Sequence, residues 1–163
     1  MPDAWVNFAV VVFVQFLLFI IVAWYAKKLP NMPRLLGWGA LIGLVMGLCF
    51  DLGLGKLLGL HSYTLGFGAP FLILNGTLSY GLFAATTLLL QSMPPRYFLP
   101  WVIVIVAVYE ITNHFFRVWA WRFSLPPLEF AVVLLTGYLG GAIIVTVISH
   151  VCFRRRVFYF NID

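Results

Sequence analysis

Five long apolar runs, separated by short segments rich in charged residues, proline and glycine, make up most of this chain. The runs cover residues 5–26, 34–51, 69–91, 98–118 and 128–152. Each is close to the ~20 residues that a helix needs to cross the ~30 Å hydrocarbon core of a bilayer. They are continuously apolar and lack the alternation of a membrane β-barrel. The pattern therefore predicts an all-α polytopic membrane protein with five transmembrane helices.

The composition favours a single integral membrane domain over residues 1–163. Of these residues 63% are hydrophobic and 9% are charged, and the mean hydropathy is +1.03, which excludes an ordinary soluble domain. The first run has no basic start, and no small-x-small cleavage site follows it. We therefore interpret it as a retained span and not as a secretory signal.

The distribution of Lys and Arg predicts the orientation in the membrane. One side holds seven of these residues and the other holds three: Lys27, Lys28, Arg34, Arg96 and Arg154 to Arg156 against Lys56, Arg117 and Arg122. Because basic residues concentrate in cytoplasmic loops, we expect an inner or plasma membrane protein with its N-terminus outside and its C-terminus in the cytoplasm. The net charge of +5 then reflects topology and contact with anionic membrane lipids, and it requires no nucleic-acid partner.

Three acidic residues, Asp51, Glu110 and Glu129, lie in or beside apolar runs. A carboxyl group in lipid is costly unless it is paired, protonated or facing a cavity, so these residues mark a functional site. The predicted topology places all three toward the outer ends of their helices. We expect them to share one pocket near the outer surface and predict them as its catalytic groups.

Polar and aromatic residues near the acids are predicted to bind the substrate. Along the fourth helix Glu110, Asn113, His114 and Arg117 share one face, which cannot point to lipid. With residues of the outer loops and the third helix, the predicted substrate-binding set is Tyr63, Asn75, Asn113, His114, Arg117, Trp119, Trp121 and Arg122. A structural polar network that fixes helix packing explains the stripe on the fourth helix equally well.

The two halves of the chain that follow the first helix resemble each other. In each half an acid, Asp51 or Glu110, ends a helix, and an aromatic loop follows. A proline then opens the next helix, and a tyrosine, Tyr80 or Tyr138, lies about three turns into it. This echo predicts a parallel two-helix repeat, 34–91 and 98–152, with an extra first helix and an axis along the membrane normal.

The run L-P-P-L-E-F from Leu125 to Phe130, with a tyrosine twelve residues after Pro126, resembles the proline-carboxylate motif of the small membrane-embedded lycopene cyclases. The apolar first span, the basic linker and the F-D-L ending of the second span are also similar to that family. The resemblance implies cyclisation of a lipid-soluble isoprenoid, started by a proton from a buried carboxyl group, either without a cofactor or with a weak dependence on one; we predict no cofactor. Where the family has two adjacent carboxylates, this chain has Leu128 and Glu129, and in the first copy it has Asn75 and no acid.

Residues Gly43 to Leu60 resemble a second family, that of the rod-shape-determining membrane protein MreD. The shared pattern is G-x-x-x-G-x-x-x-D-L-x-x-G-x-x-x-G-L, whose small-x-x-x-small spacing promotes close helix packing. This resemblance implies a non-enzymatic scaffold of a cell-shape or envelope complex. It leaves the stripe at Glu110 unexplained, and the sequence leaves open a homo-oligomer or a membrane protein partner.

Two further interpretations concern the same polar residues. Glu110 and His114 are one helical turn apart and could hold a metal together with Asp51, His61 or Glu129. Because no HExxH-like signature is present and Arg117 would compete for the carboxylates, we predict no metal. An ion-coupled carrier is disfavoured because acids confined to one leaflet do not form a relay across the membrane.

Overall fold

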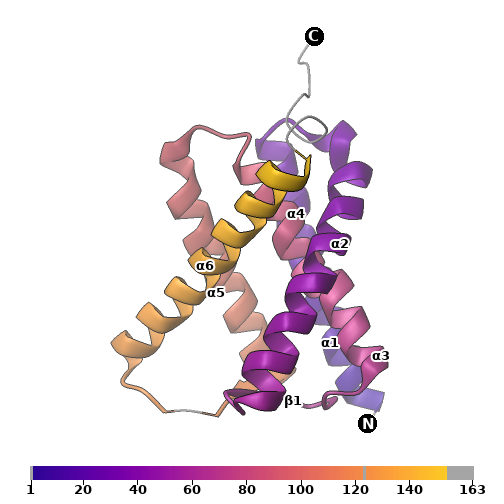
Figure 1. Ribbon diagram of the computed structural model, residues 1–163, viewed down its shortest axis with the longest axis vertical. Coiled ribbons are helices and arrows are strands. Elements are labelled where there is room, and N and C mark those ends of the chain that lie inside the picture. Colours follow the sequence, from indigo (N-terminus) through magenta and orange to yellow (C-terminus); the bar gives the residue numbers. More distant parts are fainter. Residues whose placement is uncertain (1, 123, 154–163) are drawn as a thin grey trace.

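A computed structural model describes residues 2–122 and 124–153 of the chain, and within them it has five helical spans of membrane length (Figure 1). The spans are Asp3–Tyr25, Leu29–Leu57, Ala69–Leu90, Pro95–Phe115 and Pro127–Val151. The predicted all-α membrane fold is therefore confirmed. The basic run Arg154 to Arg156 lies outside the described residues.

The spans are built from six α-helices and four short segments of other helical type. The α-helices are α1 (Pro2–Tyr25), α2 (Met32–Phe50), α3 (Ala69–Asn75), α4 (Gly81–Leu90), α5 (Phe98–Phe115) and α6 (Pro127–Phe153). The others are the 3-10 turns η1 (Leu29–Asn31) and η4 (Pro95–Tyr97) and the π-helical segments η2 (Asp51–Leu57) and η3 (Gly76–Tyr80).

The two π-helical segments interrupt spans that the sequence predicts as plain helices. We expected Asp51 to end the second helix, but that helix continues through η2 to Leu57. The Asp51 side chain finds its partners inside the protein, so the helix does not have to end at this acid. π-Helical turns are rare and often lie at functional sites, and here Asp51 begins one and Tyr80 ends the other.

Helix α4 forms the centre of the bundle, and all ten of its residues are buried. It packs most closely against α2, where backbone meets backbone. A Cβ atom added to Gly43 would lie 2.2 Å from the Gly81 nitrogen, and one added to Gly39 would lie 2.5 Å from the Gly81 oxygen. The small-x-x-x-small pattern of α2 thus joins two helices of the same chain.

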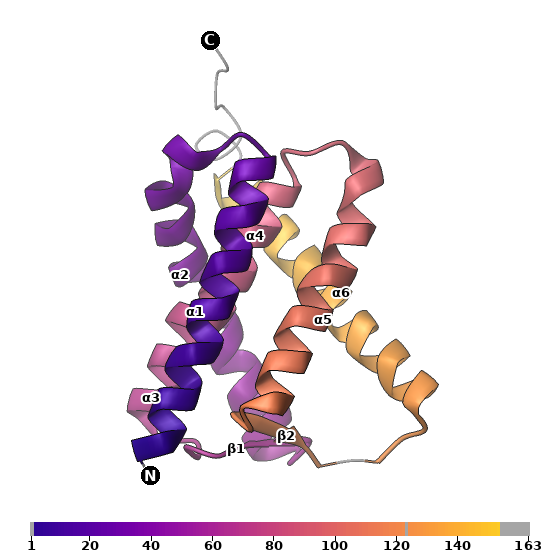
Figure 2. The same ribbon diagram turned by 180° about the vertical axis from the view of Figure 1, so that it is seen from behind.

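At one end of the bundle the two connecting loops form a small antiparallel sheet (Figure 2). Strand β1 (His61–Tyr63) pairs with β2 (Trp119–Trp121), with Ser62 opposite Ala120. The N-terminus lies at the same end, which we call the strand end. The sequence predicts loops here, and three-residue strands are too short to give a periodic signal.

The pairing of the strands shortens the fourth span. We expected its helix to reach residue 118, but α5 ends at Phe115. Arg117 has a positive φ of 52°, which turns the chain out of the helix and into β2. Beyond β2 the chain crosses to α6, whose first turns lean away from the bundle (Figures 1 and 2).

Candidate functional site

Asp51 is fully buried and accepts hydrogen bonds from three side chains. The hydroxyl groups of Tyr63 and Tyr80 donate to one carboxyl oxygen at 2.7 and 3.0 Å. The Asn75 amide donates to the other at 3.1 Å, and it also lies 3.0 Å from the Tyr63 oxygen. Both oxygens of this acid are therefore satisfied by neutral donors from β1, α3 and η3.

Glu110 is held in a similar way in the second half of the chain. The Tyr138 hydroxyl donates to one carboxyl oxygen at 2.8 Å, and the indole N–H of Trp121 donates to the other at 3.4 Å. Glu110 is half-buried, so it is less enclosed than Asp51.

These contacts give the predicted internal repeat a structural counterpart. In each half the tyrosine of the later helix donates to the acid of the earlier one, from Tyr80 to Asp51 and from Tyr138 to Glu110. In each half the third residue of the strand, Tyr63 or Trp121, also donates to that acid. The strands meet at the equivalent residues Ser62 and Ala120, as a two-fold axis through the middle of the sheet requires.

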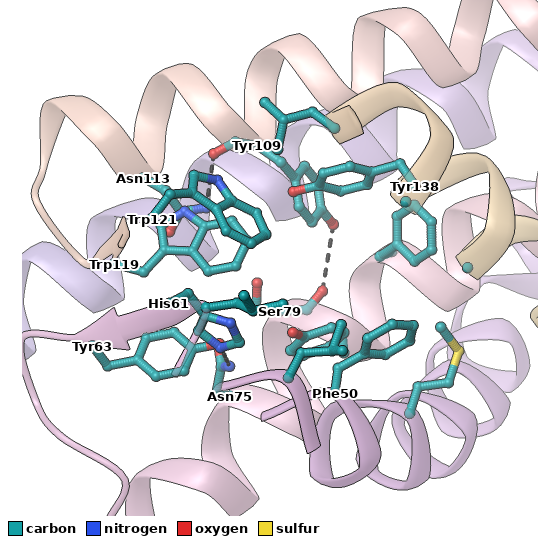
Figure 3. A pocket seen from close by; sticks show the side chains of 18 of the residues that line it. Phe50, His61, Tyr63, Asn75, Ser79, Tyr109, Asn113, Trp119, Trp121 and Tyr138 are labelled. Carbon is teal, nitrogen blue, oxygen red and sulfur yellow. Dashed lines mark hydrogen bonds between the residues drawn. The ribbon is translucent and has the colours of Figure 1, made fainter. Parts of the chain in front are cut away.

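Between the two acids lies a cavity of about 230 Å³, just below the ~300–1,000 Å³ of typical small-molecule sites. Figure 3 shows aromatic side chains of β1, β2, α2, α5 and α6 around it. Aromatic and polar residues in its wall are Phe50, His61, Tyr63, Asn75, Ser79, Tyr80, Phe83, Tyr109, Asn113, Trp119, Trp121 and Tyr138. The two acids are not in the wall themselves, but their tyrosine and tryptophan partners are.

The structure brings together five of the eight predicted substrate-binding residues. Tyr63, Asn75, Asn113, Trp119 and Trp121 line the cavity. His114, Arg117 and Arg122 are exposed and do not line it. The predicted stripe on the fourth helix is therefore broken, because α5 ends before Arg117 and only Asn113 turns toward the cavity.

Glu129 does not join the other two acids. It lies in the first turn of α6, where that helix leans away from the bundle, and it is exposed. The expected pocket is therefore lined by hydrogen-bond partners of Asp51 and Glu110, and Glu129 lies outside it. The nearest cavity-lining residue along α6 is Val133, one turn further on. A catalytic role for Glu129 stays a prediction from its motif.

Tyr80, Tyr138, His61 and Tyr109 also line the cavity and were not among the predicted site residues. Tyr80 and Tyr138 carry a sequence signal, because the internal echo places each about three turns after a proline. His61 entered the sequence analysis only as a possible metal ligand, and Tyr109 carries no signal because it lies in an apolar run. The Tyr109 hydroxyl reaches the backbone oxygen of Ser79 at 3.5 Å.

Tyr63 remains a hydrogen-bond donor over a wide range of pH. Burial is the main cause that raises its pKa well above the ordinary value of 10.0, and Tyr80 and Asp51 raise it further. Its hydroxyl group is therefore protonated at physiological pH, which suits a permanent donor to Asp51.

Chemically, the site offers proton transfer in an apolar chamber. Its two carboxyl groups are linked to the cavity through hydroxyl groups, and aromatic faces that attract positive charge surround the space. Among the described residues no group of three His, Cys, Asp or Glu side chains is placed to hold a metal ion.

No protein-family model, curated protein or solved structure matches this chain.

Proposed function

We propose that this chain is a membrane-embedded enzyme that cyclises a lipid-soluble isoprenoid of the carotenoid type by proton transfer, without a cofactor. The observation that carries the proposal is the pair of carboxyl groups, Asp51 and Glu110, each bonded to a tyrosine in the wall of one aromatic cavity. The resemblance to small lycopene cyclases points to the same chemistry. We also place the strand end, with the cavity near it, at the outer membrane surface.

The wall of the cavity suits a carbocation. Protonation of a double bond leaves a positive charge on carbon, which aromatic faces attract and which water would quench. Phe83, Tyr109 and Tyr138 form a cluster on one side, with ring centroids 5.6–6.3 Å apart. Trp119 and Trp121 cover the strand end of the cavity.

Glu110 and Asp51 differ in their hydrogen bonds, which suits Glu110 to give a proton and Asp51 to accept one. Glu110 accepts two hydrogen bonds where Asp51 accepts three. Fewer donors stabilise its charged form, so it is the better source of a proton. In the first step Glu110 is protonated and its O–H donates to the Tyr138 oxygen, the reverse of the hydrogen bond seen with the carboxylate. Tyr138 gives its own hydroxyl proton to a substrate carbon as it takes up the proton of Glu110, which leaves Glu110 as a carboxylate. A second double bond attacks the cation and closes the ring.

Asp51 suits the closing step, because three donors stabilise its charged form. A carbon next to the cation loses a proton to Tyr80, which passes its own proton to Asp51, and a new double bond forms. One proton is given and one is taken back, so the product is an isomer of the substrate. No electrons are exchanged with another molecule.

The test uses purified protein in detergent with lycopene as the probe, in H₂O and in D₂O. We expect a ring product of unchanged mass in H₂O and with one added deuterium in D₂O. Asp51→Asn and Glu110→Gln should abolish its formation. Asp3→Asn, which changes an exposed acid of α1, is the matched control and should keep the activity.

An unlabelled ring product in D₂O, or full activity in both amide variants, would overturn the proposal. If lycopene is unchanged, the lipids of membranes with and without the chain are compared by mass spectrometry. A new cyclic isoprenoid that is absent in the amide variants supports the enzyme, and its absence in the wild type overturns it.

The scaffold alternative loses its main structural support in this arrangement. Of the glycines in the MreD-like pattern, Gly43 packs against α4 and Gly47 against η3 of the same chain, so these two offer no free surface to a partner. A scaffold would keep its phenotype in the two amide variants.

A further inference from the structure

His61 is a buried residue of the cavity wall that the proposed reaction does not use. Its side chain is 2% exposed. Neither of its ring nitrogens has a hydrogen-bond partner within the described residues. A buried imidazole without a partner is unfavourable, so its place in the wall requires an explanation.

Four aromatic rings enclose this imidazole. Their centroids lie 5.2 Å (Tyr63), 5.9 Å (Phe67), 5.5 Å (Trp119) and 5.7 Å (Trp121) from that of His61. Tyr63, Trp119 and Trp121 meet it edge to face, with 68–85° between the ring planes, and Phe67 is tilted at 53°. In such edge-to-face arrangements the N–H edge of one ring can meet the electron-rich face of another, which favours a positively charged imidazole.

Asp51 lies next to these four rings, which we call the aromatic box. The Nε2 atom of His61 lies 3.5 Å from Oδ1 of Asp51, a distance at which the two side chains form an ion pair when the imidazole is protonated. Gly55 makes room for the contact, because a Cβ atom there would lie 2.7 Å from Nε2. Asp51 and Gly55 both belong to η2, and its wide π-helical turn presents both to the histidine.

We propose that His61 is a positioning residue that holds Asp51 in its charged form by taking up the Asp51 proton inside the aromatic box. The step moves one proton from Oδ1 of Asp51 to Nε2 of His61 and changes no other bond. Tyr63, Tyr80 and Asn75 stabilise the carboxylate that is formed, and the four rings stabilise the imidazolium.

Apart from Asp51, the groups that contact His61 are uncharged. From η2 it meets Asp51, and from β1 it meets Tyr63, which stays neutral because its pKa is raised by burial. The loop residue Phe67 and the two tryptophans of β2 contribute only uncharged rings. Among these groups Asp51 is the one acid that faces the imidazole.

The direct test is ¹⁵N NMR of histidine-labelled protein in detergent at neutral pH. The chain has three histidines, and His61→Phe, which keeps a ring of similar shape, identifies the signal of His61. We expect both ring nitrogens of His61 to be protonated in the wild type and one to lose its proton in Asp51→Asn. A neutral imidazole in the wild type, or one unaffected by Asp51→Asn, would overturn the proposal.

Infrared spectroscopy provides a second readout, on the acid itself. The C=O band of a protonated Asp51, identified by its loss in Asp51→Asn, should be absent in the wild type and present in His61→Phe. Gly55→Ala should also produce it, because the added methyl group displaces Nε2. Gly53→Ala, in the same π-helical segment with open space around it, is the control and should not. The same band in wild type and His61→Phe would contradict the pair.

The consequence for turnover rests on the proposed function. In the cyclisation assay His61→Phe should lower kcat at least tenfold with little change in KM, and Gly55→Ala should act in the same direction. Unchanged kcat in both variants would remove His61 from the reaction. The spectroscopic tests do not depend on turnover, so a failure of the cyclase proposal is distinguishable from a failure of this pair.

Discussion

The Tyr138 hydroxyl group donates a hydrogen bond of 2.8 Å to Glu110 across the gap between α6 and α5. Tyr138 lines the cavity, and its hydrogen bond joins α6 to α5. Tyr138→Phe removes the donor and the proton path while it keeps the ring. We expect turnover to fall roughly 10²- to 10⁴-fold, the range of one lost proton-transfer group.

The matched control is Tyr25→Phe, because Tyr25 lies near the opposite end of the bundle beside Tyr97 and Trp101. It should leave turnover in the cyclisation assay unchanged. Equal turnover of wild type and Tyr138→Phe would show that Glu110 does not act through this hydroxyl group.

Asp51 should also contribute to stability. Asp51→Ala leaves the donors of Tyr63, Tyr80 and Asn75 buried without their acceptor. We expect a loss of about 2–4 kcal/mol, because each unsatisfied buried donor costs ~1–3 kcal/mol and the site can partly relax. Asp51→Asn keeps one acceptor oxygen and should cost less. Thermal unfolding in detergent measures both, and equal stability of Asp51→Ala and the wild type would contradict the network.

Gly43 tests the contact between α2 and α4. A Cβ atom at this position would collide with the backbone of Gly81, which cannot move aside as a side chain could. Gly43→Ala should therefore destabilise the fold by about 1–3 kcal/mol or more. Gly37→Ala, on the same helix with open space around it, should be neutral or stabilising.

This result would also change how bulky glycine variants are interpreted. The scaffold hypothesis predicts that bulky changes at Gly43 or Gly47 abolish the phenotype. Because both glycines pack inside the chain, such a loss reports misfolding under either hypothesis. The acid variants are the ones that discriminate between enzyme and scaffold.

Tyr63 should make the folded state sensitive to alkaline pH. Its pKa in the folded protein is raised by burial above the ordinary value of 10.0, so the folded state favours the protonated phenol. The resulting stabilisation is complete below pH 10 and is lost as the pH rises toward the folded pKa. Tyr63→Phe should show a smaller fall in melting temperature between pH 9 and pH 11 than the wild type. An identical fall would show that Tyr63 does not contribute.

The orientation of the chain is tested by labelling single cysteines in intact cells. With Cys49 and Cys152 replaced by alanine, Ser124→Cys reports the strand end and Ser92→Cys reports the opposite end. Both positions are exposed. The distribution of Lys and Arg predicts that a membrane-impermeant maleimide labels residue 124 and not residue 92, and the reverse pattern would invert the topology.

The site shows where reasoning from the sequence reaches its limit. The spacing of acid, proline and tyrosine identified the two halves, because a repeat leaves the same order of residue types in both. The same reasoning grouped Glu129 with the other acids, since its motif is local and says nothing about the tilt of α6. It also predicted that His114 and Arg117 share one helical face. The pairing of β1 with β2 ends α5 at Phe115, and such long-range pairing leaves no signal in the local pattern.

By itself the sequence determined the five membrane spans, since twenty apolar residues in a row have no stable alternative to a helix in lipid. It also determined which acids are costly to bury and which glycines allow helices to approach closely. Only the tertiary structure decided that Asp51 and Glu110 lie on opposite sides of one cavity, that tyrosines stand between them and the space, and that His61 sits beside Asp51. Those relations depend on long-range contacts between β1 and β2 and between α2 and α4, which no local pattern encodes.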